Sequence, residues 1–239
     1  MLIAFAALVR RHRLAVDRVI HAGGHLGEEA PAYQQVGARD VLWIEGNPDM
    51  IPRLTANVAP YDHRVVQAML GSEPGRTVSF HVSNNDSMSS SLLDLGTHSI
   101  AEPGIVYVGD QSHRLQTLDA VADASGFIGA DFLNLDLQGY ELECLKGAER
   151  VLEHVRTVYV EVNVDELYRG CVLLPELDAW LNARGFEAAE VLLSGSARRD
   201  VPKGSPPFLG WGDACYLRVA EPRPLAEIHP EDAADWFFG

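Results

Sequence analysis

The chain has little cysteine, and what it has is widely spaced. Its 239 residues include only three cysteines, an odd number with no C-x-x-C pair: Cys144, Cys171 and Cys215. This pattern excludes a disulfide framework and a zinc site built from paired cysteines. We therefore expect reduced, mostly buried thiols in a cytoplasmic protein.

Positive charge is also scarce. Nineteen lysines and arginines face 34 aspartates and glutamates, which gives a formal net charge of -15. Binding of nucleic acid requires clustered basic residues that neutralise phosphates, so we expect no nucleic-acid partner. The one dense basic stretch, "VRRHR" at 9–13, fits the solvent-facing side of an N-terminal helix, with a local basic patch as the alternative.

No long hydrophobic run is present. The apolar segment "LIAFAAL" at 2–8 has no basic residues before it and continues into arginines. We therefore expect neither a secretory signal nor a membrane span. With 47% hydrophobic and 22% charged residues and no internal repeat, the chain has the composition and length of one globular domain with a full core.

Short apolar runs alternate with helical patterns along most of the chain. The predicted strands are 18–22, 41–46, 64–70, 130–137, 157–163 and 188–193, and the predicted helices are 47–58, with Asn47 as N-cap, 141–155 and 174–186. Such alternation indicates an α/β fold with an open, mainly parallel sheet and helices on both faces. Ligands of these sheets bind at the carboxyl ends of the strands.

Two segments interrupt the alternation. The strand-like 77–83 is followed by a polar stretch at 84–94, and 194–212 is rich in glycine, proline and serine. Each is either a surface loop or a lid over the strand ends. We divide the chain into an N-terminal helical segment (1–18), a main domain (19–219) and an acidic tail (220–239) whose Trp236, Phe237 and Phe238 are candidates for docking on the body or on a partner subunit.

The stretch "VIHAGGHLGEE" at 19–29 is typical of a strand, a glycine-rich turn and a helix start. Glycines there let the backbone approach a ligand, and exposed N–H groups at a helix start favour an anionic group. Glu45 ends the next strand about twenty residues on, where an acid can accept both hydroxyls of an adenosine ribose. Loop and acid together predict an adenosine-bearing cofactor, either NAD or S-adenosylmethionine.

A second polar cluster follows the strands at 130–137 and 157–163. Asp136 and Gln138 come from the first, and Glu161 and Asn163 from the second, so all four are expected at one edge of the sheet. Two neighbouring acids can orient or deprotonate an acceptor, or hold a divalent cation. The alternative is structural: Asp136 caps the following turn, and Glu161 pairs with an arginine or lysine.

These motifs carry a family resemblance. "VIHAGGHLGEE", "WIEGNP", "SSSLL", "QTLD", "FLNLDLQGYELECLKGA" and "VYVEVNVDELYRG", in this order, resemble the FkbM family of S-adenosylmethionine-dependent methyltransferases over 19–217. The resemblance implies the class I methyltransferase fold, a Rossmann-like seven-stranded sheet with an antiparallel last strand at "DACYLRV" (213–219). It also implies that the loop glycines line the methionine part of the cofactor, that Glu45 binds its ribose, and that 136–141 lies beside the transferred methyl group.

Three positions depart from the family pattern. His21 stands where aspartate is commoner, His25 where asparagine is frequent, and Asn134 where lysine is usual. An acid at position 21 would help to hold the cofactor's ammonium group, whereas a neutral imidazole can do so only through its one acceptor nitrogen.

The resemblance and the residues together define a candidate site for O-methylation of a hydroxyl on a small molecule, sugar or natural-product scaffold. Asp136 is the first candidate for the base, with Glu161, His113 and His98 as helpers. The candidate cofactor contacts are His21, Gly23, Gly24, His25, Gly27, Glu45, Asn47, Ala68, Ser90, Asp136 and Gln138. Metal dependence is left open, and a homodimer is a candidate assembly.

Two rival functions use the same features. An NAD-dependent oxidoreductase would share the glycine loop and the ribose acid, but it also needs a proton donor beside the nicotinamide, and no spaced motif supplies one. A non-catalytic binding protein on the same fold is the other, and His21 and Asn134 are the observations that motivate it.

Overall fold

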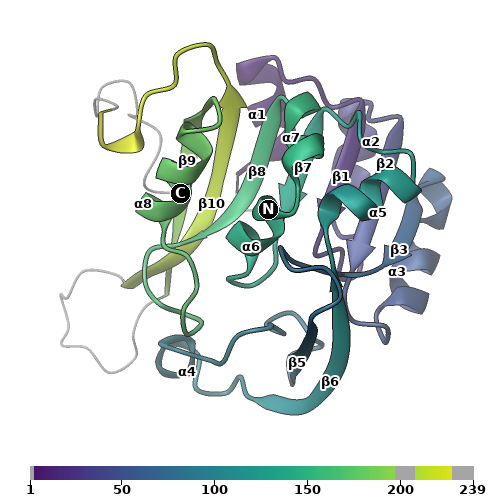
Figure 1. The fold of residues 1–239 in the computed structure, drawn as a ribbon, viewed down its shortest axis with the longest axis vertical. Coiled ribbons are helices and arrows are strands. Elements are labelled where there is room, and N and C mark those ends of the chain that lie inside the picture. The colour runs from purple at the N-terminus through teal and green to yellow at the C-terminus, as the bar shows by residue number, and fades with distance from the viewer. Residues whose placement is uncertain (1–2, 197–207, 228–239) are drawn as a thin grey trace.

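A computed structural model describes residues 3–196 and 208–227. Its main sheet has seven strands in the order β3-β2-β1-β7-β8-β10-β9 (Figure 1). The strands are β1 (Arg18–Ala22), β2 (Asp40–Glu45), β3 (Arg64–Gln67), β7 (Phe132–Leu135), β8 (Thr157–Asn163), β9 (Phe186–Ser196) and β10 (Phe208–Arg218). β10 runs antiparallel to both β8 and β9, whereas the pairs among β3, β2, β1, β7 and β8 are parallel. The class I methyltransferase fold and the antiparallel strand over 213–219 are confirmed.

Helices cover both faces of this sheet, because successive residues of each buried strand point to opposite sides. One face packs against α1 (Phe5–His12), α2 (Ala30–Val36) and α3 (Ile51–Val58), with Val19, Trp43 and Phe132 at its centre. The other packs against α5 (Leu118–Ala124), α6 (Glu141–Lys146), α7 (Glu149–His154) and α8 (Leu174–Asn182), which are in front in Figure 1. Near-continuous apolar strands are what a sheet buried on both faces requires.

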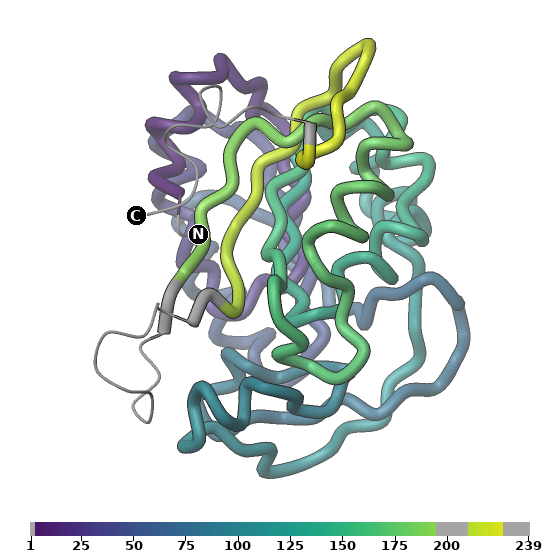
Figure 2. The backbone as a smooth tube through the Cα atoms, turned by 90° about the vertical axis from the view of Figure 1, so that its left-hand side faces the viewer, coloured from purple at the N-terminus to yellow at the C-terminus, as the bar shows by residue number. Residues whose placement is uncertain are grey.

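A small second sheet lies beyond the carboxyl ends of the main strands, at the bottom of Figures 1 and 2. It contains β4 (Met69–Leu70), β5 (Thr77–Ser83) and β6 (Tyr107–Gln116) in the order β4-β6-β5, and the short helix α4 (His98–Ala101) accompanies it. The predicted strand at 64–70 is therefore two strands, because the chain leaves the main sheet at Ala68 and joins the small one at Met69.

Several predicted boundaries were wrong. The helix expected over 141–155 is interrupted at Gly147 and Ala148 between α6 and α7. Asn47 is not an N-cap: α3 begins four residues later, and Asn47 Oδ1 accepts a hydrogen bond from Asp49 N (3.0 Å) in the preceding turn. Most of 194–212, together with Trp236, Phe237 and Phe238, lies outside the described residues.

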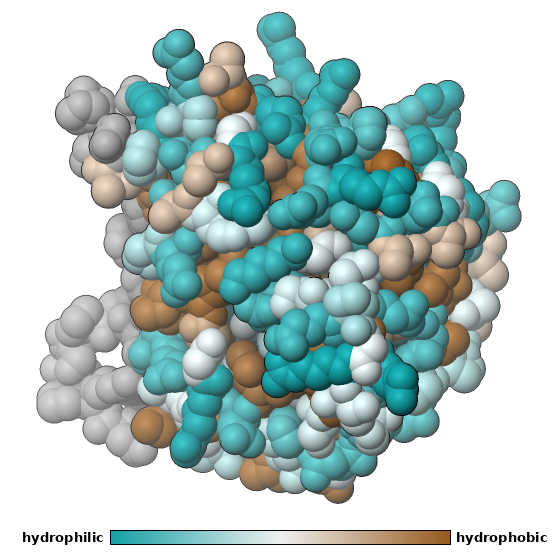
Figure 3. All heavy atoms as spheres, in the orientation of Figure 1, coloured by the Kyte–Doolittle hydropathy of each residue, from teal (hydrophilic) through white to brown (hydrophobic). Residues whose placement is uncertain are grey.

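Hydrophilic residues are interspersed with apolar ones over the helix-covered face drawn in Figure 3. None of the helices in the described part of the chain is both long enough and apolar enough to cross a membrane.

Candidate active site

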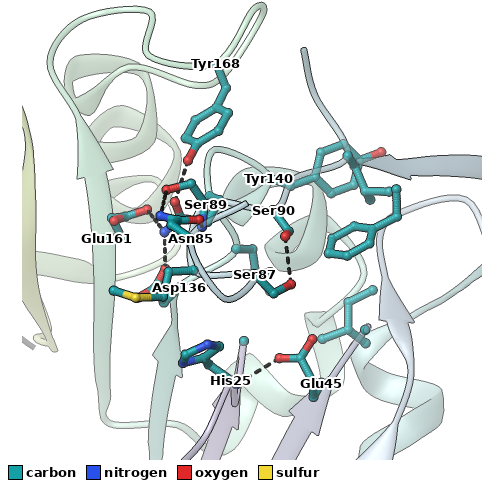
Figure 4. A pocket seen from close by; sticks show the side chains of 18 of the residues that line it. His25, Glu45, Asn85, Ser87, Ser89, Ser90, Asp136, Tyr140, Glu161 and Tyr168 are labelled. Carbon is teal, nitrogen blue, oxygen red and sulfur yellow. Dashed lines mark hydrogen bonds between the residues drawn. The ribbon is translucent and has the colours of Figure 1, made fainter. Parts of the chain in front are cut away.

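A cavity of about 570 Å³ lies where the main sheet meets the small one. Its walls come from the carboxyl ends of β1, β2, β7 and β8, from β4 and β5, and from the polar segment at 84–92, here named the serine segment. Figure 4 shows Asp136 and Glu161 next to each other, and Glu45 apart from them. The volume falls within the range of about 300 to 1,000 Å³ that small-molecule and cofactor sites occupy. The cavity therefore lies at the carboxyl ends of the parallel strands, where the fold predicts a ligand site.

Gly23 allows the glycine loop to lie against the strand end of β7. Its φ is +88°, and a Cβ added there would lie 1.8 Å from the carbonyl oxygen of Asp136. Gly23 also lines the cavity, as predicted. Gly24 and Gly27, however, are not among the residues that line it: a Cβ at Gly27 would lie 2.5 Å from Val58 Cγ1 of α3. These two glycines let the loop pack against α3, and their contact with the methionine part of the cofactor stays a prediction.

Glu45 ends β2 and is held by backbone N–H groups from two loops. Its Oε2 accepts from His25 N (2.9 Å) and its Oε1 from Asn47 N (2.7 Å). Burial raises the pKa of this carboxyl, and the two hydrogen bonds oppose that rise. Glu45 lines the cavity with a fixed orientation, and each oxygen retains a lone pair that can accept a ribose hydroxyl.

His21 is buried in a polar and aromatic cluster with Tyr33, Trp43 and Asn134. Its Nδ1 is 3.0 Å from Tyr33 Oη, its ring stacks on Trp43 at 4.4 Å, and Asn134 Nδ2 donates to Tyr33 Oη at 2.9 Å. Tyr33 Oη therefore joins His21 and Asn134 in one hydrogen-bonded group. Burial lowers the pKa of His21 to about 4, so the ring is neutral.

His21 Nδ1 is thus occupied by Tyr33, while the His21 side chain also lines the cavity, as predicted. That His21 holds the cofactor's ammonium group stays a prediction. Two departures from the family pattern, His21 and Asn134, lie in one hydrogen-bonded cluster, with 3.3 Å between Nδ1 and Nδ2. Both residues lie in the strands β1 and β7, directly before the glycine loop and the Asp136 turn.

His25 ties the glycine loop to the serine segment. Its Nδ1 is 2.7 Å from Glu28 Oε1, and its Nε2 is 2.9 Å from the carbonyl oxygen of Asp86. The Glu28 carboxylate and the Asp86 carbonyl raise the pKa of His25 to about 9, so an imidazolium donates both bonds. Arg53 adds a bidentate pair to the Asp86 carboxylate at 2.7 and 2.8 Å.

Asn47 anchors the same segment from behind. Its Nδ2 donates to Ser87 Oγ at 2.9 Å, and Ser87 Oγ lies 2.7 Å from Ser90 Oγ. Ser90, His25 and Ala68 line the cavity as predicted, whereas Asn47 is not among the lining residues. The serine segment is therefore held as a wall of the site by Asn47, whose predicted contact with the cofactor stays a prediction.

Asp136 and Glu161 meet through the side chain of Gln138. Gln138 Nε2 donates to Asp136 Oδ1 (2.7 Å) and to Glu161 Oε2 (3.1 Å). Desolvation and the charges of Asp213 and Glu29 raise the pKa of Asp136. The pKa of Glu161 is raised further above its usual range, by burial and by nearby carboxylates, of which Asp136 contributes most.

The structural alternative for these acids finds no support. Neither Asp136 nor Glu161 forms an ion pair with an arginine or lysine in the described part of the chain. Within residues 3–196 and 208–227 no group of three or more His, Cys, Asp or Glu is placed to hold a metal ion. Asn163 is buried and is not among the lining residues. The two acids therefore face the cavity with an amide donor between them.

The three remaining side chains differ in position. His113, on β6, is not among the residues that line the cavity, and its Nε2 lies 3.0 Å from Gln111 Oε1, so the structure does not support its catalytic assignment. His98 lines the far end of the cavity, with its ring centroid 5.5 Å from that of Tyr168. Tyr168, which the sequence interpretation missed, donates to Gln138 Oε1 at 2.5 Å; only its place in the quoted "DELYRG" motif could have indicated it.

Comparison with known proteins gives one family match and several relatives. The model of the Methyltransferase FkbM domain matches residues 21–188. The 2-O-methyltransferase NoeI of Sinorhizobium fredii (strain NBRC 101917 / NGR234) is 26% identical over 160 residues, which are 64% of this chain and 65% of that protein. The match thus spans slightly less than two thirds of the relative's length.

Solved structures with similar folds are more distant in sequence. Magnesium protoporphyrin IX methyltransferase (ChlM) from Synechocystis PCC 6803, solved with bound SAM, is 12% identical, with 90% of this chain and 76% of that chain covered and a TM-score of 0.49. Sp1610 of Streptococcus pneumoniae, a putative tRNA (m1A22) methyltransferase, is 11% identical, with coverages of 95% and 74% and a TM-score of 0.49.

Proposed function

The chain belongs to the FkbM methyltransferase family, and from that premise we propose that it transfers the methyl group of S-adenosylmethionine to a hydroxyl group of a small molecule. The observation that carries this proposal is one cavity with Glu45 at one end and Asp136 at the other, with Gly23 between them. Because the strand order is β2-β1-β7, these residues lie at the ends of three neighbouring strands.

The residues present fit this cofactor. At the β2 end, Glu45 is positioned to accept the ribose hydroxyls, and the apolar side chains of Met69 and Phe80 line the adjacent wall. A Cβ at Gly23 would collide with the β7 end, so only glycine leaves the loop this close. When bound there, S-adenosylmethionine supplies a methyl group activated by its sulfonium.

The chain's own contribution is positioning and proton removal. The walls hold an acceptor oxygen in line with the methyl carbon, which is a large part of catalysis in displacement reactions. The hydroxyl must lose its proton as it attacks, and Asp136 is open to the cavity and can take it. The raised pKa of Asp136 brings its basicity closer to neutral pH, where a general base is most effective.

The acceptor end supports a neutral polyhydroxy compound, such as a sugar. It is lined by Tyr168, Trp211 and His98, whose ring faces suit the apolar faces of a sugar and whose polar atoms suit its hydroxyls. None of the described residues that line the cavity is a lysine or arginine, so a phosphate or carboxylate on the acceptor would meet no cation of that kind. The name of the relative, a 2-O-methyltransferase, agrees with transfer to oxygen.

A cytoplasmic location is part of the same proposal. Cys144, Cys171 and Cys215 are all free and buried, as is usual for proteins of a reducing compartment.

Transfer of a labelled methyl group to a panel of sugars tests this function. Asp136→Asn should retain cofactor affinity and lose roughly 10²-fold or more in turnover, because a positioned general base contributes about 10² to 10⁴. The matched control is Asp123→Asn, an exposed position on α5, which should keep full activity. Full activity of the Asp136 variant on the true acceptor would remove Asp136 from the mechanism.

A further inference from the structure

Gln138 makes an unusual set of contacts for one side chain at a sheet edge. Its backbone has a φ of +52°, a left-handed conformation that is uncommon for residues other than glycine, asparagine and aspartate. Ser91 Oγ fixes it there by donating to the Gln138 carbonyl oxygen at 2.7 Å. A strained residue persists at a site only where its surroundings determine it strongly.

The orientation of the Gln138 amide follows from its partners. Nε2 faces Asp136 and Glu161, which accept, while Oε1 faces the hydroxyl of Tyr168, which donates at 2.5 Å. The opposite orientation would place the amide oxygen against two carboxylates and leave the tyrosine hydroxyl facing an N–H group. Both N–H bonds are therefore directed at the acids.

We propose that Gln138 is a positioning residue that holds Asp136 and Glu161 as one unit sharing a single proton, with Asp136 as the ionised base and Glu161 as the neutral partner. This inference rests on the proposed function, and it assigns a different role to each acid. Because one nitrogen contacts both carboxylates, two negative charges would lie close together, and one proton relieves the repulsion.

Geometry decides which acid keeps the proton. Asp136 has the shorter bond to Nε2, 2.7 Å against 3.1 Å, and its side chain is open to the cavity. Glu161 is only 9% exposed. A buried carboxyl loses more by ionising than an open one, so the proton stays on Glu161 and the charge on Asp136.

The charges around the pair raise the pKa of both acids, so they favour a proton on the pair without selecting which acid carries it. Glu161 faces the charges of Asp136, of Glu141 from α6 and of Asp213 from β10. Asp136 faces Asp213 and Glu29. Tyr168 and the neutral His21 are also at this edge of the cavity and bring no positive charge. In the reaction the acceptor's hydroxyl proton passes to the Asp136 carboxylate, and the neutral Glu161 can donate a hydrogen bond to the acceptor.

Gln138→Asn is the decisive variant, because asparagine tolerates a positive φ while its shorter side chain withdraws the amide from both acids. Loss of the donor removes stabilisation of the anions, so the apparent pKa of each acid should rise. Glu161→Gln, which leaves the Gln138 backbone untouched, replaces a neutral carboxyl group with a neutral amide and should leave the apparent pKa of Asp136 close to that of the wild type. The rise in Gln138→Asn should be about one pH unit.

Two readouts follow these shifts: titration of ¹³C-labelled side-chain carboxyls by NMR in the protein alone, and the acid limb of the pH profile of kcat. The control is Asp123→Asn, an exposed position on α5 that makes no contact with the pair and should leave both readouts unchanged. A Gln138→Asn protein whose carboxyls titrate as in wild type, with kcat reduced equally at every pH, would overturn the proposal. If the carboxyls shift as expected but the wild-type protein binds no S-adenosylmethionine, the proposed function fails and the assignment of the pair stands.

Discussion

Replacing His21 with asparagine should make the stability of the protein less sensitive to acid by about 2 kcal/mol between pH 7.5 and 5. The ordinary pKa of a histidine is 6.5, and that of His21 is about 4 in the folded protein, where the residue is 3% exposed. Because folding lowers the pKa of this base, its contribution to the free energy of unfolding is complete above pH 6.5 and is lost as the pH falls toward 4. A difference of about 2.5 pKa units corresponds to about 3.4 kcal/mol in total, of which about 2 kcal/mol is lost by pH 5.

Urea unfolding of both proteins at the two pH values measures this effect. Asparagine can still accept the Tyr33 hydrogen bond, but it loses the stacking on Trp43, so it should be the less stable protein at pH 7.5. The difference in free energy of unfolding between the two proteins should be about 2 kcal/mol smaller at pH 5, because only the wild type has a buried imidazole ring that loses stability in acid. Other titrating groups, including His25, are present in both proteins and cancel in the comparison.

His154→Asn, an exposed position on α7, is the matched control for the same exchange at the protein surface. If the difference in free energy of unfolding between wild type and His21→Asn were the same at both pH values, the claim that His21 is buried in its neutral form would be refuted. The dissociation constant of His21→Asn for S-adenosylmethionine should lie within about threefold of the wild-type value, a difference of less than 1 kcal/mol in binding free energy. A much larger loss would return His21 to direct cofactor binding.

Three further predictions concern the cavity walls. Glu45→Gln should weaken S-adenosylmethionine binding roughly 10- to 100-fold in calorimetry, because hydrogen bonds to a charged group contribute about 1.5 to 3 kcal/mol; unchanged affinity would discredit the ribose assignment. Gly23→Ala should lower the melting temperature far more than Gly37→Ala, which has a similar φ of +86° but no atom within 4 Å of the added Cβ, and equal shifts would show that strain alone matters. His25→Ala should speed release of S-adenosylhomocysteine about tenfold in stopped flow by freeing the serine segment. The wild-type rate should approach that of the variant as pH rises through about 9, and a pH-independent difference would contradict the imidazolium link.

The parallel strands were predictable because each is a continuous apolar run, as burial on both faces demands. β6 was not, because most of its ten residues are exposed or half-buried and its sequence, "YVGDQSHRLQ", shows no apolar run. The sequence also could not predict that 64–70 is divided between two sheets, because both parts read as one apolar strand. The same limit applies to α6 and α7, whose combined pattern is that of one helix.

At the site, the sequence indicated Glu45, Asp136 and Glu161, because chemistry at the ends of parallel strands follows from chain order. It could not tell which glycines face the cavity and which face α3, because this depends on where α3 packs. The position of His113 outside the cavity lining has a similar cause, because it lies on β6, a strand that the sequence pattern did not predict. The cluster that neutralises His21 joins residues up to 113 positions apart, and no local pattern reveals it.

Calorimetric titration of the purified protein with S-adenosylmethionine, S-adenosylhomocysteine and NAD tests the central claim most directly. The account predicts micromolar binding of the first two and none of NAD, with the affinity reduced in Glu45→Gln. Binding of NAD without binding of S-adenosylmethionine would contradict it.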